Sequence, residues 1–248
     1  MSSQINFIKP DLLNGAAISS WFTLRNPELT QSDQQVHGLN LGLNTNENKW
    51  VVEKSRRLLL NEIGLKKDEI AFGTQIHKTE VKLVKKGGTY ADTDAFVTNV
   101  QGLALAIQVA DCAAILLGDE DNAVIGAAHA GWRGAVGGVV LKTIQKMKVI
   151  GAEPKFIKAF ISPCISLEHF EVGEEVAGKF PEQFVDRENF SKPHVALKAF
   201  LQSQLLEAGV AESNVEVDEG CTISDEQFYS YRRQKEKSGR MMGIIKLN

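Results

Sequence analysis

The chain has 248 residues, of which 43% are hydrophobic, and its mean hydropathy of -0.15 is ordinary for a soluble protein with an apolar core. A net charge of -3 gives no electrostatic reason to expect a nucleic acid or an anionic membrane as the main partner. With 3 Cys and 5 His, the composition excludes a disulfide-stapled scaffold, a four-cysteine zinc cluster and a four-thiolate iron–sulfur cluster. One small metal site or one reactive thiol remains compatible with these counts.

The N-terminal stretch lacks the cationic start and apolar core of a signal peptide. The most apolar stretch, residues 102–118, contains Gln108 and Asp111 and is too polar to span a bilayer. An odd number of cysteines without a secretion signal favours a reducing compartment. We therefore expect a cytoplasmic protein with three free thiols.

Hydrophobic periodicity predicts a series of helices and strands along the chain. In chain order, we predict a helix over 46–64, strands over 70–76, 80–85, 95–98, 103–109, 113–117 and 123–128, a helix over 132–150, a strand over 156–161, a helix over 195–206 and a strand over 241–247. The polar residues 119–122 form a turn that can join the strands on either side into a hairpin.

Strands dominate this succession, and the helices are interspersed irregularly. That order predicts an α+β fold with mixed sheets rather than a regular βαβ repeat. No linker divides the chain, so we expect residues 1–248 to form a single domain. Four glycines at the start of the predicted helix over 132–150 require a reason such as close packing or a nearby ligand, because glycine costs about 1 kcal/mol inside a helix.

Three segments place potential metal ligands where a predicted strand ends or a turn begins: Gln75-Ile76-His77, Ala110-Asp111-Cys112 and the segment 129–134, HAGWRG. Side chains at such positions can converge from separate strands on a rigid sheet. Two imidazoles and one thiolate would leave a tetrahedral zinc one position for water or substrate, as in catalytic sites.

The residues also permit other interpretations. A lone histidine or cysteine in an apolar strand is more often a core residue than a ligand. The spacing of Cys112 and His129 matches no short metal motif, although a hairpin would bring them together, and a Cys–His nucleophilic pair is equally compatible. Asp111 can move protons or orient water, or it can simply bond to backbone in its turn.

The remaining chemistry-bearing residues give weaker signals. His37 and His194 have polar neighbours and are predicted at the surface, and His169 is predicted in a solvated loop. A basic run near the C-terminus contains Arg232, Arg233, Lys235, Lys237 and Arg240, and aromatic residues precede it. Such a run is usually a solvated face, but arginines fixed beside aromatic rings can bind a small phosphate group.

The ordered motifs resemble those of the laccase-domain family, also called multicopper polyphenol oxidoreductases and, more recently, purine nucleoside phosphorylases. The similar segments run along nearly the whole chain: 39–42 (LNLG), 75–77 (QIH), 93–98 (TDAFVT), 110–112 (ADC), 129–134 (HAGWRG), 163–165 (PCI), 171–173 (EVG), 230–233 (SYRR) and 239–240 (GR). The departures are Lys78 and Ser162 in place of glycines, and residues 167–169 and Ser224 in place of cysteines. None removes a candidate ligand, but Lys78 can alter the pocket rim.

The resemblance implies zinc bound by His77, Cys112 and His129, in a layered α+β sandwich of mixed sheets with flanking helices. It implies phosphorolysis of purine nucleosides (adenosine, inosine, methylthioadenosine) and deamination of adenosine in the same pocket. Asp111, Cys112 and His129 are then the candidate catalytic residues. Gln75, Arg133 and Arg232 are candidate substrate-binding residues, with Arg232 a candidate for placing phosphate.

Three alternatives stay open. The first is a cysteine hydrolase using Cys112 and His129, because the fold is similar to the catalytic domain of cytotoxic necrotizing factor toxins, which use a Cys–His pair. A laccase-like polyphenol oxidase with copper at the same ligands is another, although ligands for further coppers are not visible. A non-catalytic nucleoside-binding domain is the third.

Overall fold

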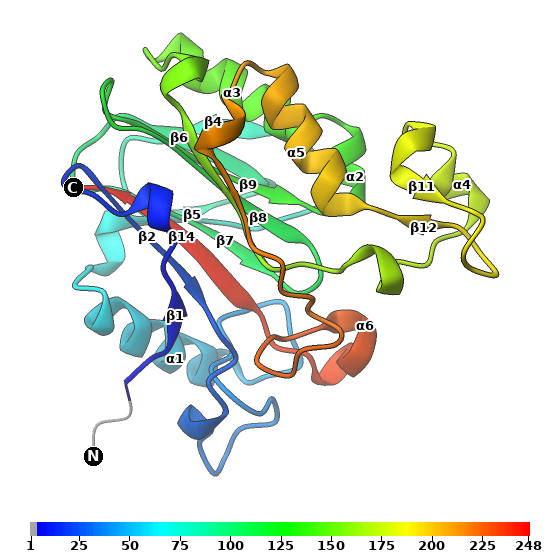
Figure 1. The fold of residues 1–248 in the computed structure, drawn as a ribbon. Coiled ribbons are helices and arrows are strands. Elements are labelled where there is room, and N and C mark those ends of the chain that lie inside the picture. Colours follow the sequence, from blue (N-terminus) through cyan, green and yellow to red (C-terminus); the bar gives the residue numbers. More distant parts are fainter. Residues whose placement is uncertain (1–3) are drawn as a thin grey trace.

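The computed structural model describes residues 4–248 and is built around two six-stranded β-sheets (Figure 1). Residues 1–3, which belong to the stretch that lacks a signal-peptide pattern, lie outside the described part of the chain. The first sheet has the order β1-β2-β14-β7-β3-β5. These strands are, in that order, Phe7–Ile8, Ile18–Thr23, Met241–Leu247, Ala104–Val109, Ile70–Gly73 and Gly88–Tyr90. Strand β3 is parallel to both neighbours and the other pairs are antiparallel.

The second sheet has the order β13-β10-β8-β9-β6-β4 and is also mixed. Its strands are, in that order, Val215–Val217, Lys158–Ile161, Ala113–Asp119, Val124–Ala130, Ala95–Thr98 and Val81–Leu83. Two short strands, β11 (Val185–Asp186) and β12 (His194–Val195), pair separately. The helices α1 to α6 are, in order, Lys49–Glu62, Trp132–Val136, Val139–Val149, Glu174–Ala177, Leu197–Glu207 and Tyr231–Gln234.

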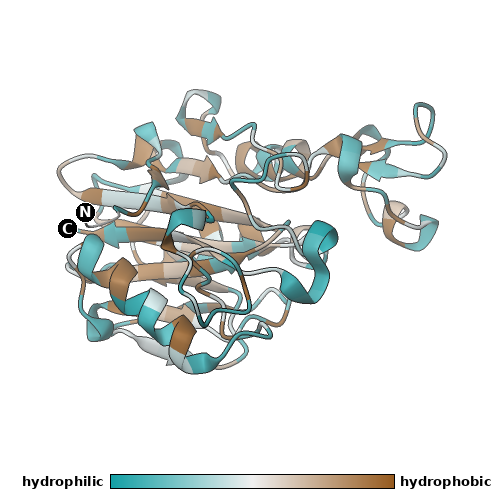
Figure 2. Ribbon diagram, turned by 90° about the horizontal axis from the view of Figure 1, so that it is seen from below, coloured by the Kyte–Doolittle hydropathy of each residue, from teal (hydrophilic) through white to brown (hydrophobic). Residues whose placement is uncertain are grey.

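The two sheets pack face to face, and helices cover their outer faces (Figure 1). Strand β8 shows the arrangement, because successive side chains of a strand point to opposite faces. Ile115 and Leu117 pack with α3 and α5, whereas Ala114 and Leu116 pack against the first sheet. Helix α1 covers the other face of the first sheet. Figure 2 shows largely hydrophobic or neutral strands surrounded by largely hydrophilic loops. The prediction of an α+β fold with layered, mixed sheets and flanking helices is confirmed.

Most predicted elements are present, with shifted ends. The hairpin predicted around residues 119–122 is formed by β8 and β9, and the last strand matches 241–247. The predicted helix over 132–150 is instead two helices, α2 and α3, because Gly138 adopts a left-handed backbone with φ of 75°. The Gly87-Gly88 pair in the sequence predicts a turn after the strand over 80–85, but Gly88 begins strand β5 instead. None of the helices in residues 4–248 is long and apolar enough to cross a membrane.

Two predicted boundaries matter for the site. The strand predicted over 70–76 ends at Gly73, so residues 75–77 form a loop. The strand predicted over 123–128 continues to Ala130, so His129 lies inside β9 rather than after it. Both changes bring the predicted ligands to the same edge of the second sheet.

Candidate active site

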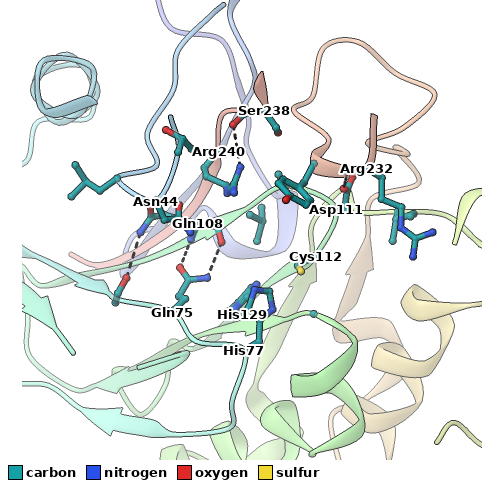
Figure 3. A pocket seen from close by; sticks show the side chains of 18 of the residues that line it. Asn44, Gln75, His77, Gln108, Asp111, Cys112, His129, Arg232, Ser238 and Arg240 are labelled. Atoms are coloured by element: carbon teal, nitrogen blue, oxygen red, sulfur yellow. Dashed lines mark hydrogen bonds between the residues drawn. The ribbon is translucent and has the colours of Figure 1, made fainter. Parts of the chain in front are cut away.

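His77, Cys112 and His129 converge as the sequence predicts. One potential ligand atom from each of these side chains lies within 4.8 Å of the others. The two imidazole centroids are 4.6 Å apart, with an angle of 64° between the rings. Figure 3 shows the three side chains turned toward one another. The structure thus contains a compact group of two imidazoles and one thiol.

The hairpin of β8 and β9 explains the approach of Cys112 to His129. Ala113 pairs with Ala130, and Ala114 pairs with His129, so Cys112 emerges beside the end of β9. His77 reaches the same place from the loop after β3. The long sequence separation of Cys112 and His129 therefore corresponds to one hairpin, and it is not a short metal-binding motif.

Asp94, a buried carboxylate, holds two of the three ligands in place. Its Oδ1 accepts hydrogen bonds from His129 Nδ1 at 2.8 Å and from the backbone N–H of His77 at 2.9 Å. Its Oδ2 accepts from the backbone N–H groups of Ile76 at 3.1 Å and Lys78 at 2.9 Å. His77 has a left-handed φ of 59°, a costly conformation for a residue other than glycine, and these three backbone bonds stabilise it.

The same contacts fix which nitrogen of His129 is available. A carboxylate only accepts hydrogen bonds, so Nδ1 must carry the proton and Nε2 remains the ligand atom. Burial raises the pKa of Asp94, but the bonds from His129 and the backbone outweigh burial and hold this pKa below its usual value. In the sequence, Asp94 belongs to the segment 93–98, whose motif predicts no role for it. Its place just before an apolar strand was the only available signal.

Cys112 and His129 also adjust each other's ionisation. Burial alone would raise the pKa of Cys112, but the charge of His129 and hydrogen bonds with both imidazoles lower it to about 6. Burial alone would lower the pKa of His129, but Cys112 and Asp94 raise it to about 9. Near neutral pH the pair therefore favours the thiolate, the form of cysteine that binds metals and attacks as a nucleophile.

The donor set suits a transition metal ion. A thiolate with two imidazoles is a ligand set found with zinc, and also with copper. Gly131 provides the necessary room, since a Cβ at this position would lie 2.7 Å from Cys112 Sγ and 3.1 Å from His77 Nδ1. These residues can therefore hold one metal ion, and its identity does not follow from the donors alone.

The ligand group opens into a cavity of about 690 Å³. This volume is within the range of small-molecule sites, roughly 300–1,000 Å³. Four aromatic side chains line it: Phe72, Trp132, Phe170 and Tyr231. The cavity therefore offers flat apolar surfaces close to a polar reaction centre. Lys78, which the sequence predicts at the pocket rim, is exposed and does not line the cavity.

The three predicted substrate-binding residues all line this cavity. Gln75 is largely occupied, because its side-chain amide exchanges two 2.8 Å hydrogen bonds with the backbone of Gln108. The guanidinium of Arg133 lies 4.3 Å from the Trp132 ring centroid. The guanidinium of Arg232 lies 5.1 Å from the Phe170 ring centroid and donates to the carbonyl oxygen of Glu171.

Asp111 also lines the cavity, and both of its carboxylate oxygens accept hydrogen bonds. Oδ1 accepts from the Thr222 hydroxyl at 2.8 Å, and Oδ2 accepts from the backbone N–H of Arg232 at 2.7 Å. Asp111 thus ties the strand end before Cys112 to the start of α6. Its backbone φ of 80° is left-handed, and these two bonds help to hold it. A role in proton transfer stays a prediction.

The other histidines lie away from the ligand group. His37 is exposed, as predicted. The surface position predicted for His194 is wrong, because its ring is buried, stacks on Phe190 at 3.8 Å and bonds to the carbonyl oxygen of Leu167. His169 is half-buried beside Cys221, whose sulfur lies 3.5 Å from its Nδ1. Cys112, Cys164 and Cys221 are all free thiols.

Two layered sheets and one histidine–cysteine–histidine group at a small-molecule cavity, as found within residues 4–248, define a class of α+β proteins with a candidate metal centre. Comparison with known proteins identifies the family. The chain belongs to the family described as multi-copper polyphenol oxidoreductase laccase, whose model matches residues 19–248.

Named relatives and a solved structure agree with this membership. A purine nucleoside phosphorylase of Corynebacterium glutamicum is 37% identical over 232 residues, which cover 90% of this chain and 92% of the relative. An adenosine deaminase from an unknown prokaryotic organism is 28% identical over 221 residues, covering 82% and 84% of the two chains. The crystal structure of a Neisseria meningitidis protein has a TM-score of 0.85 and 33% identity, covering 98% of this chain and 99% of that one.

Proposed function

We propose that this protein is a zinc-dependent purine nucleoside phosphorylase that also deaminates adenosine in the same cavity. The observation that carries the proposal is the group of His77, Cys112 and His129 at a cavity large enough for a nucleoside. The names of the relatives supply the two reactions. Purine nucleosides and inorganic phosphate are the proposed substrates.

Zinc is the proposed metal because the three protein ligands leave one coordination position for a reactant, as is usual in catalytic zinc sites. Bound there, zinc supplies Lewis acidity to the reaction. The chain supplies the rest: Asp94 fixes the orientation of His129, and Gly131 keeps space open beside Cys112.

The cavity walls are proposed to bind the nucleoside. Phe72, Trp132, Phe170 and Tyr231 offer surfaces for stacking on a purine ring. Gln75, Arg133 and Arg232 are proposed to contact the substrate with their remaining polar groups. Cys112 and His129 are proposed to act in catalysis, while Asp111 holds the start of α6 beside them. In deamination, a water oxygen bonds to the purine carbon that carries the amine and ammonia leaves. In phosphorolysis, a phosphate oxygen bonds to C1′ of the ribose and the purine leaves with the electron pair of the glycosidic bond.

A cysteine hydrolase is the second candidate, and the lowered pKa of Cys112 beside His129 favours it. The predicted likeness to the cytotoxic necrotizing factor domain belongs with this alternative. It requires activity without metal, whereas the zinc proposal requires the metal. A copper-dependent polyphenol oxidase and a nucleoside-binding domain without catalysis are the remaining alternatives.

The decisive experiment is chromatography of the products formed from adenosine, with and without phosphate, by protein of measured zinc content. Adenine reports phosphorolysis and inosine reports deamination. Cys112→Ala should lose bound zinc and both products, because the thiolate ligand is removed. Cys164→Ala is the matched control: Cys164 is buried in the core, so its loss can lower stability but should leave zinc bound.

Each alternative predicts a different outcome. Full activity in zinc-free protein would overturn the zinc proposal in favour of the cysteine hydrolase. Intrinsic blue absorbance with stoichiometric copper would favour the oxidase. Tight adenosine binding with neither adenine nor inosine would favour the binding domain.

A further inference from the structure

Two arginines, Arg56 and Arg240, line the cavity beside the loop of residues 39–42. This loop is the LNLG segment of the sequence, for which no role has been given so far. Arg56 comes from α1, and Arg240 immediately precedes β14. Figure 3 shows Arg240 beside Asn44 and Gln108, with Arg232 on the other side of Asp111. The basic residues of the cavity are therefore divided between two regions.

Neutral groups of the chain hold Arg56. Its Nε donates to the carbonyl oxygen of Leu41 at 2.9 Å, and its Nη2 donates to Gln108 Oε1 at 3.0 Å. The guanidinium lies 4.7 Å from the centre of the Phe72 ring. Gln108 is in turn fixed by Gln75, so Arg56 has a defined position at the cavity wall.

Arg240 is held in the same way on the other side of the loop. Its Nη1 donates to the carbonyl oxygens of Ser238 at 3.2 Å and Gly239 at 2.9 Å. Gly42 makes room for it, since a Cβ there would lie only 2.3 Å from Arg240 Cγ. Arg56 binds Leu41 and Arg240 packs on Gly42, so the two arginines contact consecutive residues of the same loop.

Neither arginine has a carboxylate partner within residues 4–248. Arg56 Nη1 and Arg240 Nε and Nη2 form no hydrogen bond with any described residue. Burial lowers the pKa of Arg56 to about 10, although the charge of Glu53 acts in the opposite direction. The charges of Asp111 and Glu236 act on the pKa of Arg240 in the same direction, but none of these carboxylates forms an ion pair with either arginine. Arginine stays charged under these conditions, so this part of the cavity holds two guanidinium groups without a direct carboxylate contact and with free donors.

We infer that Arg56 and Arg240 form the binding site for inorganic phosphate, the co-substrate of phosphorolysis. The inference rests on the proposed function. The planar, forked donors of arginine match the oxygens of a phosphate group, and the anion supplies the direct charge partner that neither guanidinium has among the described residues. Arg232 lies apart from Arg240, on the other side of Asp111 (Figure 3), and its guanidinium donates to the carbonyl oxygen of Glu171.

Bound here, phosphate becomes the nucleophile of phosphorolysis. One of its oxygens forms a bond to C1′, the bond from C1′ to the purine nitrogen breaks, and the leaving purine keeps the electron pair and takes up a proton. The products are a purine and a ribose 1-phosphate. Two arginines also neutralise the charge that phosphate brings toward the ribose.

Phosphate binding can be measured directly and apart from turnover. Inorganic phosphate is titrated into zinc-loaded wild-type protein and into Arg56→Gln, Arg240→Gln and Arg57→Gln, with calorimetry as the readout. Arg57 is the matched control, because it neighbours Arg56 on α1 but is exposed and outside the cavity lining. We expect phosphate affinity to fall at least tenfold in R56Q and in R240Q and to be unchanged in R57Q. Thermal unfolding without phosphate verifies that each variant is folded, and Arg240→Lys, which keeps the charge but loses the fork, should be intermediate.

Turnover gives the second readout. With adenosine and phosphate, the KM for phosphate should rise at least tenfold in R56Q and R240Q, and the ratio of adenine to inosine should fall accordingly. Phosphate affinities within twofold of wild type in both folded variants would overturn the inference while leaving phosphorolysis intact. Loss of phosphate binding in both variants of a protein that forms neither product would support the anion site and overturn the proposed function.

Discussion

The two ends of the cavity differ in the groups that contact their basic side chains. At the metal end, Asp94 is buried behind the ligands and accepts a hydrogen bond from His129. At the arginine end, Arg56 and Arg240 contact neutral carbonyl and amide oxygens. A carboxylate built into the fold fixes an imidazole as a metal ligand, whereas unpaired guanidinium groups favour a bound anion. The cavity thus has one end suited to a cation and another suited to an anion.

Apart from replacement of a ligand itself, the largest expected effect at the metal end follows from replacing its carboxylate. Asp94→Asn keeps the shape of the side chain but removes one acceptor oxygen, so the bond to His129 and the bonds to residues 76–78 compete for what remains. We expect metal affinity to fall about 10- to 100-fold, the usual cost of losing a residue that orients a ligand. Competition with a chromophoric chelator measures this affinity.

Asp119→Asn provides the matched control for this comparison. Asp119 is equally buried, and it accepts three hydrogen bonds, from Asn122 and Glu153, at the far end of β8. Its replacement should lower the free energy of unfolding without changing metal affinity. Equal metal affinities in D94N and D119N would mean that Asp94 serves folding alone, and the contrast between the cavity ends would lose its main support.

The contacts of Asp94 could not be predicted from the sequence. The strand that was predicted to run to residue 76 ends at Gly73, because Asp94 takes the backbone N–H groups of Ile76, His77 and Lys78 out of the sheet. That contact joins two loops and has no local pattern. In contrast, the hairpin of β8 and β9 could be predicted, since its apolar strands and polar turn are adjacent in the chain.

At the arginine end, helix α1 could be predicted from the sequence, but the position of Arg56 could not. The apolar period of α1 predicts the helix and would place Leu58 on the buried face, but Leu58 is 39% exposed, and Leu60 is buried instead. Arg56 turns inward because Leu41 and Gln108 accept its hydrogen bonds. Both acceptors are distant in the sequence, so hydropathy alone could not place this guanidinium in the cavity. The three candidate metal ligands could be predicted, because each lies where a predicted strand ends or a turn begins, in a motif that resembles those of a known family.

A smaller effect is expected from crowding the metal end without changing its charge. In Gly131→Ala the new Cβ would press on Cys112 Sγ and His77 Nδ1. The backbone at Gly131 has φ of -75° and ψ of 169°, which alanine adopts without strain, so the effect should be confined to the ligands. We expect metal affinity to fall about tenfold, near the lower end of the cost of disturbing ligand orientation, with little change in unfolding temperature.

Gly102→Ala is the opposite case and serves as its control. Gly102 has φ of 78° and open space around its missing Cβ, so alanine there should cost about 1 kcal/mol of stability from backbone strain and leave the metal bound. Chelator competition and chemical denaturation on both variants separate the two effects. A G131A protein that binds metal as tightly as wild type would show that the ligands have more freedom than their contacts suggest.

The smallest effect is expected from replacing Asp111. Its charge lies close to both ends of the cavity: Asp111 directly precedes Cys112, and its charge raises the pKa of Arg240, which burial lowers. Both of its oxygens already accept hydrogen bonds from Thr222 and Arg232, so the structure favours holding α6 over moving protons. Asp111→Asn should cost about 1 kcal/mol of stability, the usual net worth of one hydrogen bond, and lower deamination by no more than about tenfold. The pH profile of deamination should keep its shape, because a residue that only holds α6 transfers no proton in the reaction. A loss of more than about 100-fold with a displaced pH profile, in folded and zinc-loaded D111N, would instead establish the proton-transfer role predicted from the sequence.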